Sequence, residues 1–199
     1  MNVVISGPSG VGKGTLIERL KRDFYDIEIE KSISYTTRIP RKTEENGVDY
    51  HFVSMEEFVM LANNNFFFEF VEYDKNFYGI PNVNVHQNSK IEIFDLVASS
   101  GLNIKKSFPN TILIYILPPS LNVLNKRRGN RGDDRVSVDL EQMKFVDEYD
   151  YLIINDDIDK SYKQLLNIIK ISFQSSIKNN ANLLNDFYDS VVGLKKILK

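Results

Sequence analysis

Gly7-Pro-Ser-Gly-Val-Gly-Lys13 is the stretch that decides the fold. It matches the pattern G-x-x-x-x-G-K of a phosphate-binding loop, in which glycines let backbone N–H groups approach a phosphate closely. The β-branched run Met1–Ser6 before it predicts a buried strand, and the apolar spacing in Lys13–Arg22 predicts a helix. The start of that helix and the ammonium group of Lys13 would both attract a phosphate. The sequence therefore predicts a strand–loop–helix unit that binds a nucleoside triphosphate.

Strands and helices continue to alternate along the chain. Asn65–Tyr78 is dense in aromatic residues, which we interpret mainly as core. Alternation of this kind predicts an α/β fold with a parallel sheet that helices cover on both faces. The expected strands are Asp49–Ser54, Ile91–Val97, Thr111–Leu117 and Tyr151–Ile154, and the expected helices are Met55–Asn63, Leu121–Arg128, Ser161–Phe173 and a last one in Ser175–Lys199.

The composition excludes several classes of protein. With 199 residues, 42% of them hydrophobic and 26% charged, the chain suits one compact domain. A net charge of -2 argues against non-specific binding of nucleic acid. The lack of cysteine excludes disulfides and thiolate metal sites, and His51 and His86 lack the spacing of metal ligands. Since no signal-like start and no apolar run of roughly 20 residues is present, we expect a soluble, cytoplasmic protein without a membrane partner.

A second group of residues suited to phosphate follows in Ser32–Tyr50. Arg38 and Arg41 flank Pro40, and the planar fork of a guanidinium matches the oxygens of a phosphate. A solvated basic loop is the alternative, but the rigid Pro40 and the phenol of Tyr50 favour an organised site. The sequence thus predicts a site for a second phosphate group.

These motifs together resemble guanylate kinase, a nucleoside monophosphate kinase of the P-loop class. The similarity runs in order from about residue 3 to about residue 170. It rests on Gly7–Lys13, Ser32–Arg41, Gly47–Phe52, Phe68-Glu69, Phe77–Gly79, Pro118–Leu121 and Asn155–Asp157. The resemblance implies a three-layer kinase core with a parallel sheet, plus an inserted mixed α/β subdomain for the monophosphate and a small lid. It assigns 1–31, 82–125 and 149–174 to the core, 32–81 to the monophosphate subdomain, 126–148 to the lid and 175–199 to a helical tail.

The resemblance also implies a role for individual residues. It places GMP at Ser34, Arg38, Arg41, Tyr50, Glu69, Tyr78 and Gly79, with Glu69 accepting hydrogen bonds from guanine. It places ATP at Ser9, Gly10, Val11, Gly12, Lys13, Gly14, Thr15 and Asn155, with Asn155 against adenine. It names Lys13, Arg38, Arg127 and Arg131 as catalytic, the last two from the lid. It implies Mg²⁺ as cofactor, held mainly by nucleotide phosphates and water without protein ligands, and a monomer or homodimer whose partners are ATP and GMP.

The chemistry of phosphoryl transfer agrees with this set of residues. The reaction needs two anionic nucleotides in line and positive charge around the transferred group, and it needs no strong general base. Because water competes as acceptor, we expect a closing lid, and the glycine- and charge-rich Gly129–Asp134 suits one.

Three features depart from the family pattern. In the base pocket, Ile80 stands where the family has Ser or Thr, and Val97 stands at the second acidic position of the stretch that begins at Asp95. Each loss could cost about 1–3 kcal/mol if its partner stays buried. Guanine recognition would then depend mainly on Glu69. In the phosphate loop, Gly14 replaces a Ser or Thr whose hydroxyl would reach Mg²⁺.

The third departure is a lid several residues shorter than usual. Arg135 or Gln142 would complete it, and the sequence leaves both open. The leading expectation is ATP + GMP → ADP + GDP, with dGMP as a further acceptor, in purine nucleotide metabolism. A binding module without catalysis would have little reason to keep Lys13 and the lid arginines. A kinase of altered base specificity is motivated by Ile80 and Val97, whereas a P-loop GTPase would need switch motifs that are not found.

Overall fold

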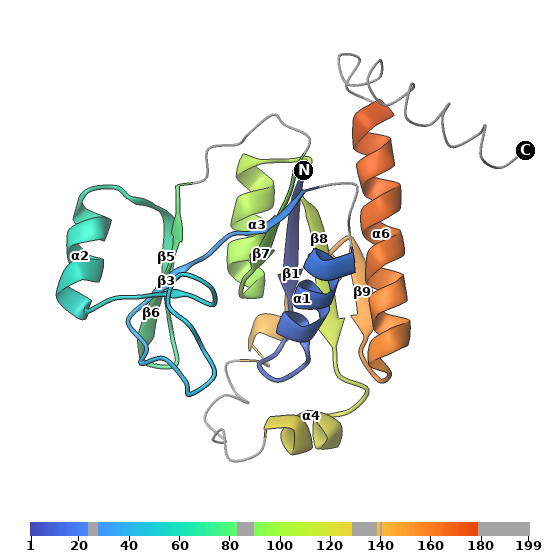
Figure 1. Ribbon diagram of the computed structural model, residues 1–199, viewed down its shortest axis with the longest axis horizontal. Coiled ribbons are helices and arrows are strands. Elements are labelled where there is room, and N and C mark those ends of the chain that lie inside the picture. Colours follow the sequence, from blue (N-terminus) through green and yellow to red (C-terminus); the bar gives the residue numbers. More distant parts are fainter. Residues whose placement is uncertain (24–27, 83–89, 129–138, 140, 179–199) are drawn as a thin grey trace, which may run out of the picture.

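The computed structural model describes residues 1–23, 28–82, 90–128, 139 and 141–178 (Figure 1). Strands and helices alternate over most of this length, as the sequence predicts. The strands are β1 (Asn2–Ser6), β2 (Ile29–Lys31), β3 (Tyr35–Thr36), β4 (His51–Phe52), β5 (Phe67–Tyr73), β6 (Asn76–Pro81), β7 (Ile91–Asp95), β8 (Ile112–Leu117) and β9 (Tyr151–Ile154). The helices are α1 (Lys13–Asp23), α2 (Met55–Asn63), α3 (Ala98–Ser107), α4 (Leu121–Arg128), the 3-10 helix η1 (Val146–Glu148) and α6 (Ile158–Lys178).

The main sheet has five parallel strands in the order β2-β7-β1-β8-β9. The central strands β1 and β8 are apolar on both faces, because helices cover both. Val3 and Ile5 of β1 pack into one core cluster, and Val4 between them packs into the other. The α/β fold with a covered parallel sheet is therefore confirmed.

Helices α1 and α6 cover one face of the main sheet, and α3 covers the other (Figure 1). The apolar residues Leu16, Ile17 and Leu20 recur at helical spacing on α1 and are at most 1% exposed. Burying each such side chain stabilises the fold by about 1.5–3 kcal/mol. The centre of the sheet is thus buried on both faces, and the cavity with its polar side chains lies at the end of the sheet where β1 leads into the phosphate-binding loop.

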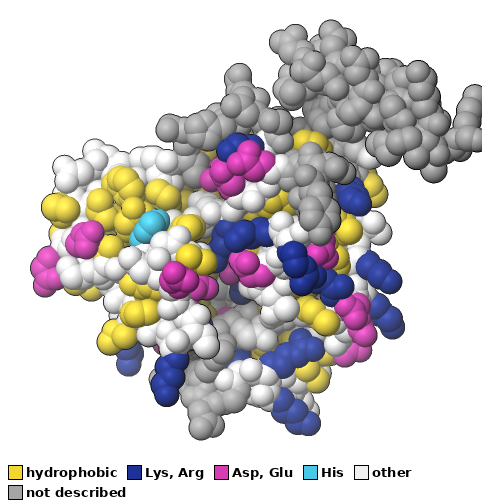
Figure 2. Space-filling view, in the orientation of Figure 1, with side chains coloured by type: hydrophobic (Ala, Val, Ile, Leu, Met, Phe, Trp, Pro, Cys, Tyr) yellow, Lys and Arg dark blue, Asp and Glu magenta, His cyan; other side chains and the backbone are white. Residues whose placement is uncertain are grey.

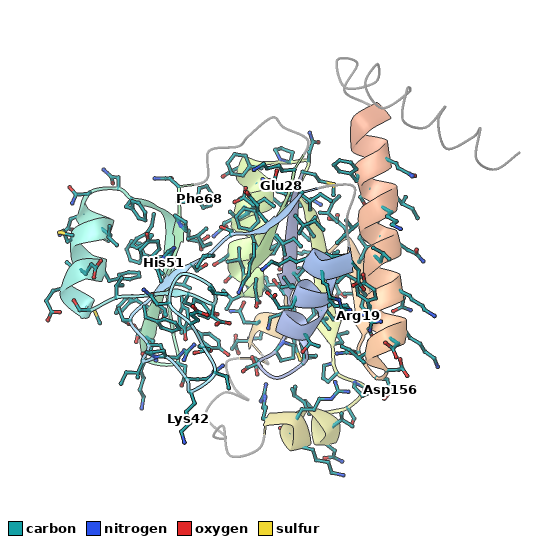
Figure 3. All side chains as sticks on the ribbon, in the orientation of Figure 1. Arg19, Glu28, Lys42, His51, Phe68 and Asp156 are labelled. Atoms are coloured by element: carbon teal, nitrogen blue, oxygen red, sulfur yellow. The ribbon has the colours of Figure 1, made fainter. Side chains whose placement is uncertain are left out.

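A second, mixed sheet lies beside the first, in the order β4-β3-β6-β5, with α2 packed on it (Figure 1). Phe58 of α2 stacks on Phe67 with ring centroids 4.7 Å apart. Phe68 lies toward α3 (Figure 3), and its ring centroid is 6.0 Å from that of Phe108 at the end of this helix. This contact connects the second sheet to the helix that covers the main sheet. The aromatic stretch that we interpret mainly as core forms the hairpin of β5 and β6: Phe67 is buried, most of its other rings are half-buried, and Phe70 is 50% exposed.

Several predicted boundaries need correction. The strand expected at Asp49–Ser54 is only His51–Phe52, because its neighbour β3 offers just two residues for pairing. The helix expected at Ser161–Phe173 begins earlier, at Ile158, because the carboxylate of Asp157 accepts hydrogen bonds from the next free N–H groups. That helix also includes the first residues of the expected tail helix, and residues 179–199 lie outside the described part of the chain. No helix among the described residues is long and apolar enough to cross a membrane.

Candidate active site

The phosphate-binding loop joins β1 to α1 and is shaped by its glycines. Gly7 has φ +144°, and a Cβ atom there would lie 2.3 Å from the main-chain oxygen of Ile116. Only glycine can therefore bring the loop this close to β8. The ammonium group of Lys13 turns back over the loop, donates a hydrogen bond of 2.7 Å to the Gly7 oxygen and lies 3.7 Å from the carboxylate of Asp95. The loop and its lysine are thus preformed.

Asn155 holds this loop through a hydrogen bond from its side chain. It follows β9, is 3% exposed and donates from Nδ2 to the main-chain oxygen of Val11 at 2.7 Å. A Cβ atom at Gly12 would lie 2.5 Å from the same nitrogen, so Gly12 and Asn155 fit only as a pair. Asn155 Oδ1 is buried and has no hydrogen-bond donor among the described residues. The adenine contact expected for Asn155 stays a prediction, and the contact that is present is to the loop.

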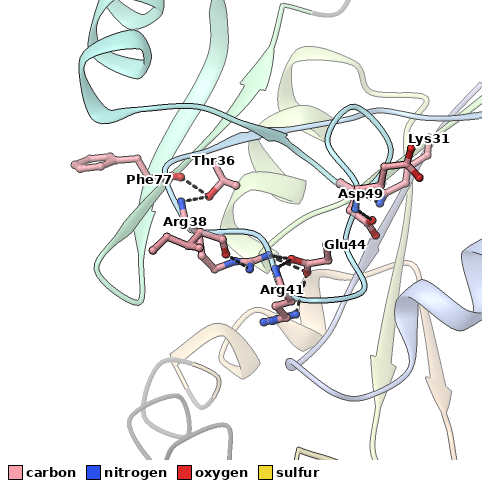
Figure 4. A network of polar contacts seen from close by, with 9 residues as sticks. Lys31, Thr36, Arg38, Arg41, Glu44, Asp49 and Phe77 are labelled. Carbon is pink, nitrogen blue, oxygen red and sulfur yellow. Dashed lines mark hydrogen bonds and ion pairs between the residues drawn. The ribbon is translucent and has the colours of Figure 1, made fainter.

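Arg38 and Arg41 meet on one carboxylate in the loop between β3 and β4 (Figure 4). Arg38 donates to both oxygens of Glu44 at 2.9 Å, and Arg41 donates at 3.2 Å. The main-chain N–H of Arg41 also donates to Glu44, at 2.8 Å. Glu44 therefore holds both guanidinium groups in place and offsets part of their mutual repulsion.

Aromatic rings complete the surroundings of Arg38. Its guanidinium carbon lies 5.6 Å from the ring centroids of both Tyr50 and Phe52. Burial raises the pKa of Tyr50 well above its usual range, so its phenol stays neutral and can donate a hydrogen bond at any physiological pH. Tyr78 lies beside it, with ring centroids 5.8 Å apart. Two cations and two phenols thus converge, as a binding site for a phosphate monoester requires.

Glu69 lies at the other end of the site, on β5. The pairing of β5 with β6 shifts its register between Phe67 and Glu69, and bulges of this kind redirect a side chain. Glu69 Oε1 accepts hydrogen bonds from Ser100 Oγ at 3.2 Å and from Asn103 Nδ2 at 3.0 Å. Sequence reasoning missed both donors, because they lie 31 and 34 residues from Glu69 in the chain and only the packing of α3 brings them to it.

The lid is described only at its ends. Arg127 lines the site and donates to the main-chain oxygen of Asn155 at 2.8 Å. Arg128, which sequence reasoning missed, donates to the Ser9 oxygen at 2.8 Å and pairs with the buried carboxylate of Asp139. Gln142 accepts a hydrogen bond from the Ser99 N–H at 3.1 Å. Arg131, Arg135 and the loop 129–134 lie outside the described residues.

A cavity of about 460 Å³ connects these groups. Lysine and arginine side chains mix with acidic ones on the face between the two sheets (Figure 2). Of the predicted residues that the structure describes, three do not line the cavity: Val11, Gly79 and Asn155. A Cβ atom at Gly79 would lie 2.6 Å from the ring of Phe67, which accounts for that glycine by packing. The predicted residues that line the cavity are Ser9, Gly10, Gly12, Lys13, Gly14, Thr15, Ser34, Arg38, Arg41, Tyr50, Glu69, Tyr78 and Arg127.

Comparisons with known proteins agree with this geometry. The family model described as guanylate kinase matches residues 1–172. A guanylate kinase of Mannheimia succiniciproducens is 37% identical over 92% of this chain and 94% of its own, and one of Shewanella violacea is 39% identical over 84% and 85%. The crystal structure of guanylate kinase from Anaplasma phagocytophilum superposes with a TM-score of 0.71 at 30% identity, over 86% of this chain and 85% of that one. The chain therefore belongs to the guanylate kinase family.

Proposed function

We propose that this chain transfers the terminal phosphoryl group of ATP to GMP, using the residues of the cavity between its two sheets. One observation carries the proposal. The loop around Lys13 and the cluster of Arg38 and Arg41 line one cavity of about 460 Å³ from two different sheets. Two anion sites that open into a single cavity suit a reaction between two phosphorylated nucleotides, whereas a binding module needs only one.

The donor phosphates would lie on the loop. The backbone N–H groups at the start of α1 and the ammonium of Lys13 point where a triphosphate would end. Lys13 would shift from the Gly7 oxygen to the transferred group and offset the charge that spreads over its oxygens. Arg127, and Arg131 from the lid, would add positive charge as the lid closes over the reactants.

The acceptor phosphate would lie on Arg38 and Arg41, with hydrogen bonds from Ser34, Tyr50 and Tyr78. Glu44 keeps the two guanidinium groups oriented before GMP arrives, so little ordering remains to be done on binding. Glu69 would accept hydrogen bonds from the N1 and amino groups of guanine. The apolar side chains of Ile80 and Val97 line the same cavity and would contact the base without reading it.

Mg²⁺ fits this site as a companion of the nucleotide. Groups of three His, Cys, Asp or Glu side chains that could hold a metal do not occur in the described part of the chain. Mg²⁺ commonly keeps several waters and binds through one or two carboxylates and substrate phosphates. Asp95, 3.7 Å from Lys13, would hold such waters. The ion would supply charge neutralisation between the phosphates.

Three further points remain proposals. The monophosphate subdomain is proposed to span 32–81 and the lid 126–148, since the second sheet and the described ends of the lid fall within these ranges. The cytoplasm is proposed as the location, because ATP and GMP are available there. Whether the chain acts as a monomer or a homodimer stays open to measurement.

The test is a comparison of acceptors. Purified protein with ATP and Mg²⁺ receives GMP, dGMP, AMP, CMP or UMP, and release of ADP is followed. We expect turnover with GMP and dGMP far above that with the other three. Absence of turnover with every acceptor, together with retained GMP binding, would identify a binding module. Turnover of AMP at the rate of GMP would refute the base assignment and leave the fold untouched.

A further inference from the structure

The two oxygens of the Glu69 carboxylate differ in their hydrogen bonds. Oε1 accepts two hydrogen bonds, from Ser100 at 3.2 Å and from Asn103 at 3.0 Å. Oε2 is buried and meets no hydrogen-bond donor among the described residues. A carboxylate oxygen has about two lone-pair positions, so Oε1 is satisfied by protein donors and Oε2 is left for a ligand.

The two donors belong to a different part of the fold from Glu69. Ser100 and Asn103 lie one turn apart on α3, which packs on the main sheet, whereas Glu69 lies on β5 of the second sheet. Ser100 is 2% exposed, so its hydroxyl has little freedom to turn elsewhere. The contact therefore fixes the rotation of the carboxylate relative to the main sheet, and with it the direction of Oε2.

This arrangement matters because Ile80 and Val97 are apolar at positions where the family pattern has polar side chains that would read a base. Ile80 is 4% exposed and, like Val97, presents only carbon atoms to the cavity. A single carboxylate discriminates between bases only if its orientation is fixed, since a freely rotating one can meet many hydrogen-bond patterns. Hydrogen bonds to a charged group are also among the stronger ones in proteins.

We propose that Ser100 and Asn103 are positioning residues for base recognition: they bind one oxygen of Glu69 and so hold the other toward the N–H groups of the acceptor base. This inference rests on the proposed function, because it assigns Glu69 to the base. A purely structural role, in which the contacts only fasten α3 to β5, is the competing explanation. The two explanations differ in what an isosteric change at Asn103 should do.

Asn103→Asp provides that change. It keeps the shape of the side chain but replaces the amide donor by a second carboxylate facing Glu69. If the donor matters, Asn103→Asp should be worse than Asn103→Ala, because both variants lose the donor and Asn103→Asp also places a negative charge beside Glu69. If the contacts only fasten α3 to β5, both Asn103 variants should lower the melting temperature and raise KM for GMP and KM for ATP together. Ser100→Ala removes the other donor, and Ser107→Ala on the exposed end of α3 is the matched control.

KM for GMP, KM for ATP and turnover of AMP would be measured for each variant, beside the melting temperature. We expect Ser100→Ala and Asn103→Ala to raise KM for GMP about tenfold, and Asn103→Asp to raise it about 100-fold, with KM for ATP within about twofold of wild type. The preference for GMP over AMP should fall in the same order. Ser107→Ala should match wild type in every measurement.

Two outcomes would overturn the inference. One is an Asn103→Asp variant as good as Asn103→Ala. The other is an equal rise of both KM values that follows the melting temperature, since that is the signature of a loosened fold. Failure of the proposed function itself would look different: the wild type would not turn over GMP. Calorimetric binding of GMP to the same variants would then still test the positioning role, and a wild type that does not bind GMP would refute both proposals.

Discussion

The side-chain amide of Asn155 donates a hydrogen bond of 2.7 Å to the main-chain oxygen of Val11. The two residues are far apart in the chain, and their contact fastens the end of β9 to the middle of the phosphate-binding loop. Because this amide leaves no room for a side chain at position 12, the loop can approach Asn155 this closely only with glycine there. The relationship suggests that Asn155 acts on ATP through the loop, whether or not it also contacts adenine.

Asn155→Ala should therefore weaken the binding of triphosphate in general. We expect it to lower the free energy of unfolding by about 1–3 kcal/mol, because the buried Val11 oxygen loses its partner. Inhibition by inorganic tripolyphosphate, which lacks adenine, should weaken in parallel with the binding of ATP. Unchanged inhibition by tripolyphosphate beside weakened ATP would instead support adenine contact alone. Asp156→Ala, next along the chain and exposed, serves as the control.

Lys13→Ala should separate the two nucleotide sites. Loss of a positive charge that acts on the transferred group commonly costs about 10²–10³ in kcat. Since GMP is proposed to bind at the other end of the cavity, its dissociation constant, measured by calorimetry, should stay within about twofold of wild type. Lys21→Ala on the exposed side of α1 should leave both quantities unchanged. Equal loss of turnover and of GMP binding would show that the division of the two sites is wrong.

The two arginines of the acceptor site should respond differently to lysine. Arg38 is 11% exposed and uses its planar fork on both oxygens of Glu44, whereas Arg41 is 40% exposed. Lysine cannot form the fork or stack on the nearby rings. Arg38→Lys should thus raise KM for GMP about 10–100-fold and lower the melting temperature, since bonds to charged groups contribute about 1.5–3 kcal/mol. Arg41→Lys should raise KM for GMP but change the melting temperature little. An equal fall of the melting temperature in both variants would contradict the expected difference between the two arginines.

The parts of the fold that the sequence predicts well are those with local causes. The bounds of α2 follow from Ser54, whose side chain accepts a hydrogen bond from the Glu57 N–H, and from the apolar spacing that follows. The phosphate-binding loop follows from Gly7 and Lys13 and the elements on either side. In each case a signal of a few residues determines the structure.

The parts that the sequence did not predict depend on contacts between distant segments. Ser100 lies 31 residues from Glu69, and Arg128 lies 119 residues from Ser9. Nothing local to Arg128 distinguishes it from an exposed lysine or arginine at the end of a helix, yet it is 5% exposed and paired with Asp139. Strand β2 was missed for a similar reason. It is only three residues long, and its place at the edge of the sheet depends on pairing with the distant β7. Such features follow from tertiary packing, which a pattern of hydrophobicity does not encode.

Tyr115 should make the stability of this protein sensitive to alkaline pH. It lies on β8, is 1% exposed and packs edge-on against Tyr149, with ring centroids 5.2 Å apart. Burial raises the pKa of Tyr115 to about 12. The unfolded chain would release this proton near the ordinary pKa of about 10, two units earlier. Between these values the folded state binds more protons than the unfolded state, so stability must fall as pH rises.

Tyr115→Phe should therefore flatten the loss of stability above about pH 10. Each raised tyrosine contributes a slope of up to about 1.4 kcal/mol per pH unit, and the variant lacks one such contribution. Urea unfolding at pH 9, 10 and 11 measures the slope, and Tyr151→Phe on the more exposed β9 is the control that should follow wild type. Burial also raises the pKa of Tyr149, so part of the slope should persist in Tyr115→Phe. Parallel curves for wild type and Tyr115→Phe would mean that the phenol ionises no later in the folded protein than in the unfolded chain.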